Sequence, residues 1–208
     1  MTTVNITTGY NLSFDVLTDE QKEKAIEMVR EREERSEDDF FSENVIEYYK
    51  EQVFPEYGLE DTEVHWSGFW CQGDGASISA ENVDLEKFLR KVKALTKFRS
   101  IRHLFGTMHD GELSASIERD KYSRYSHENT VSGYIDTTWL DLTAKQENKV
   151  EDLEELITET VRELSRKVYV DLEEAYLEQF TAENLIGLIA ANDWRFDVDE
   201  YGEMSFHK

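Results

Sequence analysis

A long stretch of regularly spaced apolar residues near the C-terminus limits the folds that this chain can adopt. From about Gln146 to Phe180, apolar residues recur at steps of three and four, at Val150, Leu153, Ile157, Val161, Leu164, Val168, Leu172 and Tyr176. That spacing places them on one face of an α-helix. The pattern predicts one long helix, or two helices that meet near residues 168–171, and the apolar face needs a second layer to cover it.

Other segments predict further helices and strands. Acidic residues directly after Thr18, with basic residues further along, predict a helix that begins there. A second helix is expected from Ser36 or Ser42 to Pro55, a third over residues 83–98, and a last one after Thr181. Strands are expected where the apolar period changes to two, in "TEVHWSGFW", "ASISA", "GELSASIER", "NTVSGYIDT" and a closing hairpin in "RFDVDEYGEMSF".

This order of elements predicts an α+β fold. Hairpins alternate with helices, so the strands are expected to form an antiparallel sheet that the helices cover, among them the long C-terminal helix. The sequence contains a single proline, no repeat and no low-complexity linker. We therefore expect a single acidic domain over residues 1–208.

The composition limits the environment in which the chain works. Its one cysteine, Cys71, cannot form an internal disulfide, so a reducing cytoplasm is expected. No apolar run is long enough to cross a membrane, and residues 1–14 lack the basic and apolar regions of a signal peptide. The net charge of −23 predicts repulsion from nucleic acids and from anionic membranes, so neither is an expected partner.

The negative charge is concentrated toward the two ends. Residues 15–63 carry 18 acidic and 6 basic residues, residues 147–203 carry 17 and 5, and residues 64–146 carry 11 of each. One interpretation is a solvated surface that keeps the protein in solution. The other is that carboxylates on helix faces imitate the phosphates of a nucleic-acid strand and bind a basic protein surface. The candidates for that role are Glu31, Glu33, Glu34, Glu37, Asp38, Asp39, Glu151, Glu154 and Glu155.

A basic segment lies in the neutral middle of the chain. Residues 86–102 contain Lys87, Arg90, Lys91, Lys93, Lys97, Arg99 and Arg102. This segment could fold against the acidic helices and neutralise them, which would reduce the exposed negative field. It could instead form a second surface for a partner.

The stretch "HWSGFWCQGDGAS", residues 65–77, joins aromatic residues to a turn sequence. Asp-Gly supplies the positive-φ positions of a tight hairpin, so QGDG is the expected turn. If the strand alternation continues, Trp66 and Trp70 share one face and Phe69 takes the other. The stretch is then either a packed structural hairpin or a binding surface. The members of that surface would be Trp66, Trp70, Gln72, Asp74, Tyr125 and His127.

Motifs for metal binding and covalent catalysis are missing from the sequence. It has no His-Glu-x-x-His pair, and one cysteine cannot build a zinc cluster. The Cys71 thiol has no basic neighbour in sequence to activate it, and Ser67 lacks the Gly-x-Ser-x-Gly elbow. His127 is expected to have a structural role in its loop. We therefore expect no catalytic residue, no metal and no cofactor.

Four segments carry a resemblance to a known family: "LSFDVLTDEQKEKAIE", "SGFWCQGDGAS", "RYSHENTVSG" and "LEEAYLEQFTAENLIGLIAANDWRFDVDEYGE". They resemble phage and prophage proteins that are often labelled antitoxins of toxin–antitoxin systems, and that contain a central Ser-Gly-Phe-Trp-x-Gln-Gly-Asp-Gly-Ala segment. The resemblance covers most of the chain and implies a phage-encoded protein. Three features depart from the family pattern: Cys71 replaces the usual serine, Glu200 and Tyr201 interrupt the usual Asp-Gly ending, and residues 118–123 have no counterpart.

Together these observations favour a non-enzymatic, phage-encoded acidic protein in the cytoplasm of the host cell. It is expected to bind and occlude a host protein that handles nucleic acid, such as a defence enzyme or a toxin, and to act as a nucleic-acid mimic. The alternative is a small-ligand or nucleotide-binding protein, or an enzyme, that uses the "WCQGDGAS" hairpin with Tyr125 and His127. The sequence leaves the target and the oligomeric state open.

Overall fold

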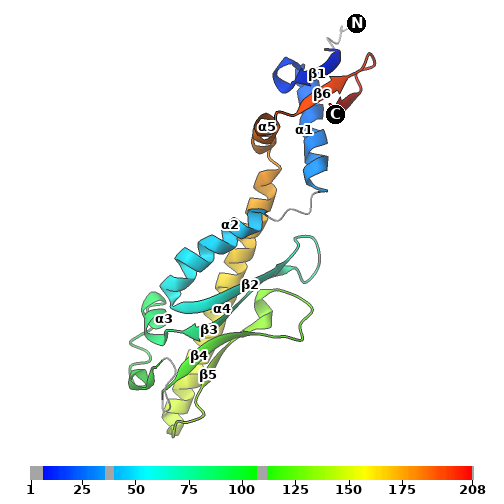
Figure 1. The fold of residues 1–208 in the computed structure, drawn as a ribbon. Coiled ribbons are helices and arrows are strands. Elements are labelled where there is room, and N and C mark those ends of the chain that lie inside the picture. The colour runs from blue at the N-terminus through cyan, green and yellow to red at the C-terminus, as the bar shows by residue number, and fades with distance from the viewer. Residues whose placement is uncertain (1–6, 36–39, 107–111, 208) are drawn as a thin grey trace. The chain divides into compact units, whose positions relative to one another are not determined.

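The computed structural model describes residues 7–35, 40–106 and 112–207 (Figure 1). The helices are α1 (Asp19–Glu33), α2 (Phe40–Tyr48), α3 (Leu85–Lys91), α4 (Ala144–Gln179) and α5 (Ala182–Ala191). A π-helical turn (Tyr49–Val53) and a 3-10 turn (Phe54–Tyr57) continue the chain from α2. The strands are β1 (Gly9–Ser13), β2 (Leu59–Ser67), β3 (Gly75–Val83), β4 (Ser114–Arg119), β5 (Val131–Asp136), β6 (Arg195–Val198) and β7 (Met204–Phe206).

The packing divides the chain into two compact units. Unit 1 is drawn from residues 1–40 and 174–208, and unit 2 from residues 41–173. Each unit has its own antiparallel sheet and its own hydrophobic core. Helix α4 begins in unit 2, and its last residues, from Glu174, belong to unit 1.

Unit 1 is built on a sheet with the strand order β1-β6-β7. Helix α1 begins with a capping box, in which the Thr18 hydroxyl accepts the Gln21 N–H and the Gln21 side chain accepts the Thr18 N–H. This capping box satisfies two backbone N–H donors at the start of the helix. The apolar side of α1 joins α5 and β6 in a core that contains Ala25, Val29, Leu185, Ile189 and Phe196.

Unit 2 is built on a sheet with the strand order β2-β3-β4-β5. Alternate strand residues are buried, and they share a core with the apolar stripe of α4, which runs behind the strands in Figure 1. From the sheet, this core contains Ile78, Ala80, Ile117, Val131 and Ile135. From α4 it contains Leu153, Ile157, Val161, Leu164 and Val168. The residues between the buried strand positions therefore form the opposite, more exposed face of the sheet.

Helix α4 also covers the edge of the sheet at β5. Three hydrogen bonds join the β5 backbone to α4 side chains: the Gly133 N–H donates to Thr158 Oγ1 (2.8 Å), the Ile135 N–H to Glu154 Oε1 (3.3 Å), and Arg162 Nε to the Val131 carbonyl (3.2 Å). An edge strand otherwise presents unpaired backbone groups to other chains. The helix therefore completes the polar pairing of β5 as well as its apolar packing.

The α+β fold predicted from the sequence is confirmed, including the antiparallel hairpins and the long C-terminal helix. The long helix is continuous, with no break at residues 168–171. Helix α3 ends at Lys91, before the predicted end at Phe98, and Lys93 has a φ of +58°, outside the helical range. Strand β1 was not predicted, because its pairing partner β6 lies at the other end of the sequence.

Gly133 lies where α4 approaches the sheet closely. A Cβ at this position would lie 2.6 Å from Cγ2 and 2.9 Å from Cβ of Ile157. We expect Gly133→Ala to lower the free energy of unfolding by about 1–3 kcal/mol, because strand and helix must separate to make room. Urea denaturation measures this change.

Gly187 in α5 provides the matched control. Outside its own helix, no atom lies within 4 Å of a Cβ at this position. Gly187→Ala should therefore raise the free energy of unfolding, by up to about 1 kcal/mol, through the higher helix propensity of alanine. Equal effects of the two substitutions would contradict the tight packing at Gly133.

Candidate functional site

The QGDG turn joins β2 to β3, and the Asp74 side chain fixes its shape. Asp74 Oδ2 accepts the N–H groups of Trp70 (3.0 Å) and Cys71 (2.6 Å). The positive φ, +100°, occurs at Gly73 and not in the Asp74–Gly75 pair where it was expected. The predicted turn is thus confirmed, and the Asp74 carboxylate is already used by the backbone of the turn.

The turn packs against the loop that connects β4 to β5. A Cβ at Gly73 would lie 2.5 Å from the Tyr125 ring, and a Cβ at Gly75 would lie 2.5 Å from Cβ of His127. The rings of Tyr125 and His127 lie 6.4 Å apart. The structure therefore brings the QGDG turn together with Tyr125 and His127, and the two glycines make this approach possible.

The two tryptophans of the motif have different environments. Trp66 stacks on Phe69, with ring centroids 5.4 Å apart, and contacts Phe41 edge-on at 5.6 Å. Trp70 lies in the turn and is 74% exposed. The expectation that Trp66 and Trp70 share one face is wrong, because β2 ends at Ser67 and its alternation does not reach residue 70. Gln72 is exposed in the same turn.

Tyr169 of α4 anchors the start of the turn. Its hydroxyl donates to the Gly68 carbonyl at 3.1 Å, and its ring lies 5.5 Å from the Phe69 ring. Burial raises the pKa of Tyr169, and the negative charges of Asp74 and Glu173 raise it further. The hydroxyl therefore remains protonated at neutral pH and available as a donor.

His127 has the structural role that was expected from the sequence. Its Nδ1 accepts the Asn129 N–H at 3.1 Å, and its carbonyl accepts the Thr130 hydroxyl at 2.7 Å. These bonds hold the short 3-10 turn that leads into β5. Across the ranges that the structure describes, His, Cys, Asp and Glu side chains form no group of three or more that could hold a metal ion.

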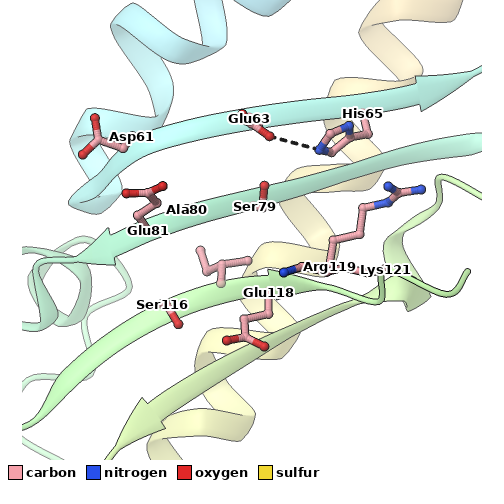
Figure 2. Close-up of a pocket in the computed structure, with 11 residues that line it drawn as sticks. Asp61, Glu63, His65, Ser79, Ala80, Glu81, Ser116, Glu118, Arg119 and Lys121 are labelled. Carbon is pink, nitrogen blue, oxygen red and sulfur yellow. Dashed lines mark ion pairs between the residues drawn. The ribbon is translucent and has the colours of Figure 1, made fainter.

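A groove of about 500 Å³ lies on the exposed face of the β2-β3-β4 strands (Figure 2). Strand pairing places Glu63 opposite Ser79, and Ser116 opposite Tyr134. Ser79 and Ser116 are short, whereas the side chains around them are long. The groove follows from this alternation of small and large residues on one face of the sheet.

The groove carries opposite charges toward its two ends. Figure 2 shows Asp61 and Glu81 toward one end and His65, Arg119 and Lys121 toward the other. Glu63 lies between them and pairs with His65, with Glu63 Oε2 3.4 Å from His65 Nε2. Glu118 adds a fourth carboxylate from β4.

Arg119 connects the groove to the loop that faces the QGDG turn. Its Nη2 donates to the Tyr125 carbonyl and to Ser126 Oγ, each at 3.3 Å. Its Nε is buried and has no hydrogen-bond partner within the described part of the chain. The sequence interpretation did not select these groove residues. Period-two alternation along β2 and β3 could have indicated that Glu63, His65, Ser79 and Glu81 share a face, but it could not have placed β4 beside them.

The predicted acidic surface is divided between the two units. In unit 1, Glu31 and Glu34 are exposed near the end of α1, Glu33 is half-buried, and Glu31 pairs with Arg35 at 3.2 Å. Three other candidates, Glu37, Asp38 and Asp39, lie outside the described residues.

In unit 2, the acidic candidates on α4 have two different roles. Glu151 and Glu155 are exposed. Glu154 is half-buried and accepts the Ile135 N–H at 3.3 Å. The prediction that groups Glu154 with the exposed carboxylates is therefore corrected, since its carboxylate completes the pairing of β5.

The basic segment at residues 86–102 finds its ion pairs within unit 2. Arg90 and Arg102 both pair with Glu86, and Lys91 pairs with Glu56. Hydrogen bonds from Arg102 and Arg90 lower the pKa of Glu86. The segment thus neutralises two nearby carboxylates.

A family comparison covers most of the chain. Residues 41–182 match a family described as a domain of unknown function, DUF8835. The chain belongs to this family. The DUF8835 segment begins at the residue where unit 2 begins, so the QGDG turn and the groove both lie inside it. No curated protein and no solved structure matches the chain. In the described ranges, every helix of this DUF8835 protein is too short or too polar to cross a membrane.

Removing the Asp74 carboxylate should loosen the turn. Asp74→Ala eliminates the acceptor for two backbone N–H groups, so we expect the free energy of unfolding to fall by about 1–2 kcal/mol. Asp74→Asn keeps one side-chain carbonyl and should cost less. Urea denaturation tests this order, and a larger loss for asparagine than for alanine would contradict the capping role.

The Glu86 pairs predict a pH dependence. Because the folded-state pKa is lowered, the pairing contributes stability above the unfolded-state pKa and loses it as the pH falls through the folded-state value. Arg102→Gln should raise the pKa of Glu86 toward its ordinary value in an NMR titration. Lys87→Gln is the control, because Lys87 makes no ion pair with the described residues. The same shift in both variants would exclude a specific effect of Arg102.

Proposed function

We propose that this DUF8835 protein is a non-enzymatic binding protein whose exposed carboxylates occupy the basic surface of a partner protein. The partner would be a protein that handles nucleic acid, such as a defence enzyme or a toxin, and binding would block its phosphate-binding residues. The protein would then act as an inhibitor and a nucleic-acid mimic, without binding nucleic acid itself.

The observation that carries this proposal is the surplus of unpaired carboxylates on an exposed, concave face. Of the four carboxylates that line the groove, only Glu63 has an ion pair with the described residues, and its partner is a histidine. Further exposed carboxylates lie at Glu31, Glu34, Glu151 and Glu155. Unpaired like charges repel one another, and a basic partner would relieve that repulsion.

The proposed mode of inhibition is occlusion. Partner lysines and arginines that normally contact phosphates would pair with these carboxylates instead. Exposed aromatic residues such as Trp70 would add contact area, because tryptophan, tyrosine and arginine dominate binding energy at interfaces. Mimicry of this kind needs no catalytic residue, metal or cofactor.

The resemblance to phage and prophage proteins supports a phage-encoded protein that acts in the cytoplasm of the host cell. The single cysteine is consistent with that reducing compartment. The net charge of −23 disfavours direct contact with nucleic acids and with anionic membranes.

The second candidate function is ligand binding at the QGDG turn with Tyr125 and His127. The close contact of the turn with both residues favours it. Two polar groups of this set are already engaged, however, because Asp74 caps backbone N–H groups and His127 Nδ1 accepts the Asn129 N–H. The acidic binding function therefore has the stronger support.

A salt-dependent affinity experiment tests the proposal. The immobilised full-length protein is incubated at low salt with a lysate of the cell that carries the gene, and bound proteins are released by raised salt and identified by mass spectrometry. We expect a nucleic-acid-handling protein with a basic surface, released because salt screens charge pairs. A partner without a basic surface, or one that salt does not release, would contradict the proposal.

Charge reversal then measures the contribution of each surface. Glu31→Lys with Glu34→Lys, and Glu151→Lys with Glu155→Lys, should each weaken binding of the identified partner by about tenfold or more. The control is the double variant Asp141→Lys with Glu200→Lys, since both residues are exposed and lie outside the candidate surfaces. Equal losses in all variants would indicate a general effect of net charge.

A further inference from the structure

We propose that the groove on the exposed face of the β2-β3-β4 strands binds one extended peptide segment of mixed charge. Basic side chains of the segment would lie at the end formed by Asp61 and Glu81. An acidic side chain or a C-terminal carboxylate would lie at the end formed by Arg119 and Lys121. This inference rests on the proposed function, and it specifies the partner segment that the groove accepts.

The size of the groove suits a short segment. Its volume is about 500 Å³, which lies within the range of roughly 300–1,000 Å³ that is typical of ligand sites. The short Ser79 side chain leaves the middle of the groove open for a backbone to approach, and Ser116 does the same toward the end with Asp61 and Glu81. Their hydroxyls offer donors and acceptors to that backbone. A folded domain would contact the face more broadly, but only a narrow chain could enter the groove.

The charge distribution selects the sequence of that segment. Asp61 and Glu81 would attract lysine or arginine and repel a phosphate backbone. Arg119 and Lys121 would repel a uniformly basic peptide at the other end. A segment with separated blocks of basic and acidic residues satisfies both ends, which neither a nucleic acid nor a polycation does.

The Arg119 side chain is held in place for this role. Hydrogen bonds to the Tyr125 carbonyl and to Ser126 Oγ orient its guanidinium group. Its Nε is a buried donor without a partner in the described residues, and buried donors are normally paired. A carboxylate in the groove would pair with the charge of the guanidinium group rather than with this buried Nε. Because the loop at Tyr125 rests on Gly73, the QGDG turn acts as a support for the cationic end of the groove.

NMR titration of the 15N-labelled full-length protein tests the proposal. Three synthetic peptides serve as probes: Lys-Lys-Ser-Gly-Glu-Glu, the scrambled Lys-Glu-Ser-Gly-Lys-Glu, and hexalysine. We expect the first to shift amide signals of the groove residues on β2, β3 and β4, and to bind about tenfold more tightly than the other two, the equivalent of one well-placed charge pair. Equal affinity for the first two peptides would overturn the proposed charge order.

Matched variants distinguish the groove from net charge. Asp61→Asn with Glu81→Gln should weaken binding of the first peptide about tenfold, again the effect of one charge pair. Asparagine tolerates the positive φ of +49° at residue 61, so the fold is retained. Asp141→Asn with Glu147→Gln changes the net charge equally, at two exposed carboxylates outside the groove and the other candidate surfaces, and should leave peptide binding unchanged. Equal weakening by both pairs would overturn the groove assignment.

The two proposals fail in different ways. If the peptides shift amides of α1 or α4 instead of the groove, the groove inference is wrong while acidic binding of a basic partner stands. If a second copy of the chain occupies the groove, self-association in sedimentation experiments will compete with the peptide and overturn the assignment to a partner segment. If no peptide binds and no basic partner is released by salt, both proposals are wrong.

Discussion

The contact between α4 and β5 determines how unit 2 is organised. At Gly133 the helix comes so close to the strand that no side chain fits between them. Side chains of α4 also pair with the β5 backbone, so one helix provides both the apolar cover of the sheet and the polar cover of its edge. Because α4 occupies this face, the opposite face remains open, and the groove forms there.

A second contact connects the most unusual sequence motif to that open face. The QGDG turn is held from one side by Tyr169 of α4 and packs on the other against the loop at Tyr125. The same loop orients Arg119 through its backbone carbonyl. Gly73 and Gly75 therefore leave room for the loop at Tyr125 to pack against the turn. In that position the loop orients Arg119 of the groove. The motif is therefore a structural hairpin that also supports a residue of the groove.

The distribution of ion pairs in unit 2 leaves most carboxylates of the groove unpaired within the described residues. Three of the seven basic residues in the segment 86–102, Arg90, Lys91 and Arg102, pair with Glu56 and Glu86. These three bases are engaged away from the groove and do not pair with its carboxylates. The groove lies within residues 41–182, so it belongs to the segment that defines the family.

Local patterns in the sequence were sufficient for most elements of the fold, with strand β1 and the end of α3 as the exceptions. The step of three and four from Val150 to Tyr176 predicted α4, and the cap at Thr181 predicted the start of α5. Alternation by two predicted the hairpins of the four-stranded sheet. These patterns are reliable because helices and strands repeat their geometry every few residues. The side-chain pattern that identifies each element therefore lies within a short stretch of sequence.

The candidate site could be identified only from the tertiary structure. Helical spacing places Glu154 beside the buried stripe of α4, unlike Glu151 and Glu155, but only the tertiary structure shows that its carboxylate pairs with β5. The different environments of Trp66 and Trp70 likewise depend on where β2 ends and on a tyrosine about a hundred residues away. The sequence by itself determined most of the elements, the charge and the turn. Only the tertiary structure decided which polar groups are paired and which face stays open, because those outcomes depend on contacts between segments that are far apart in the chain.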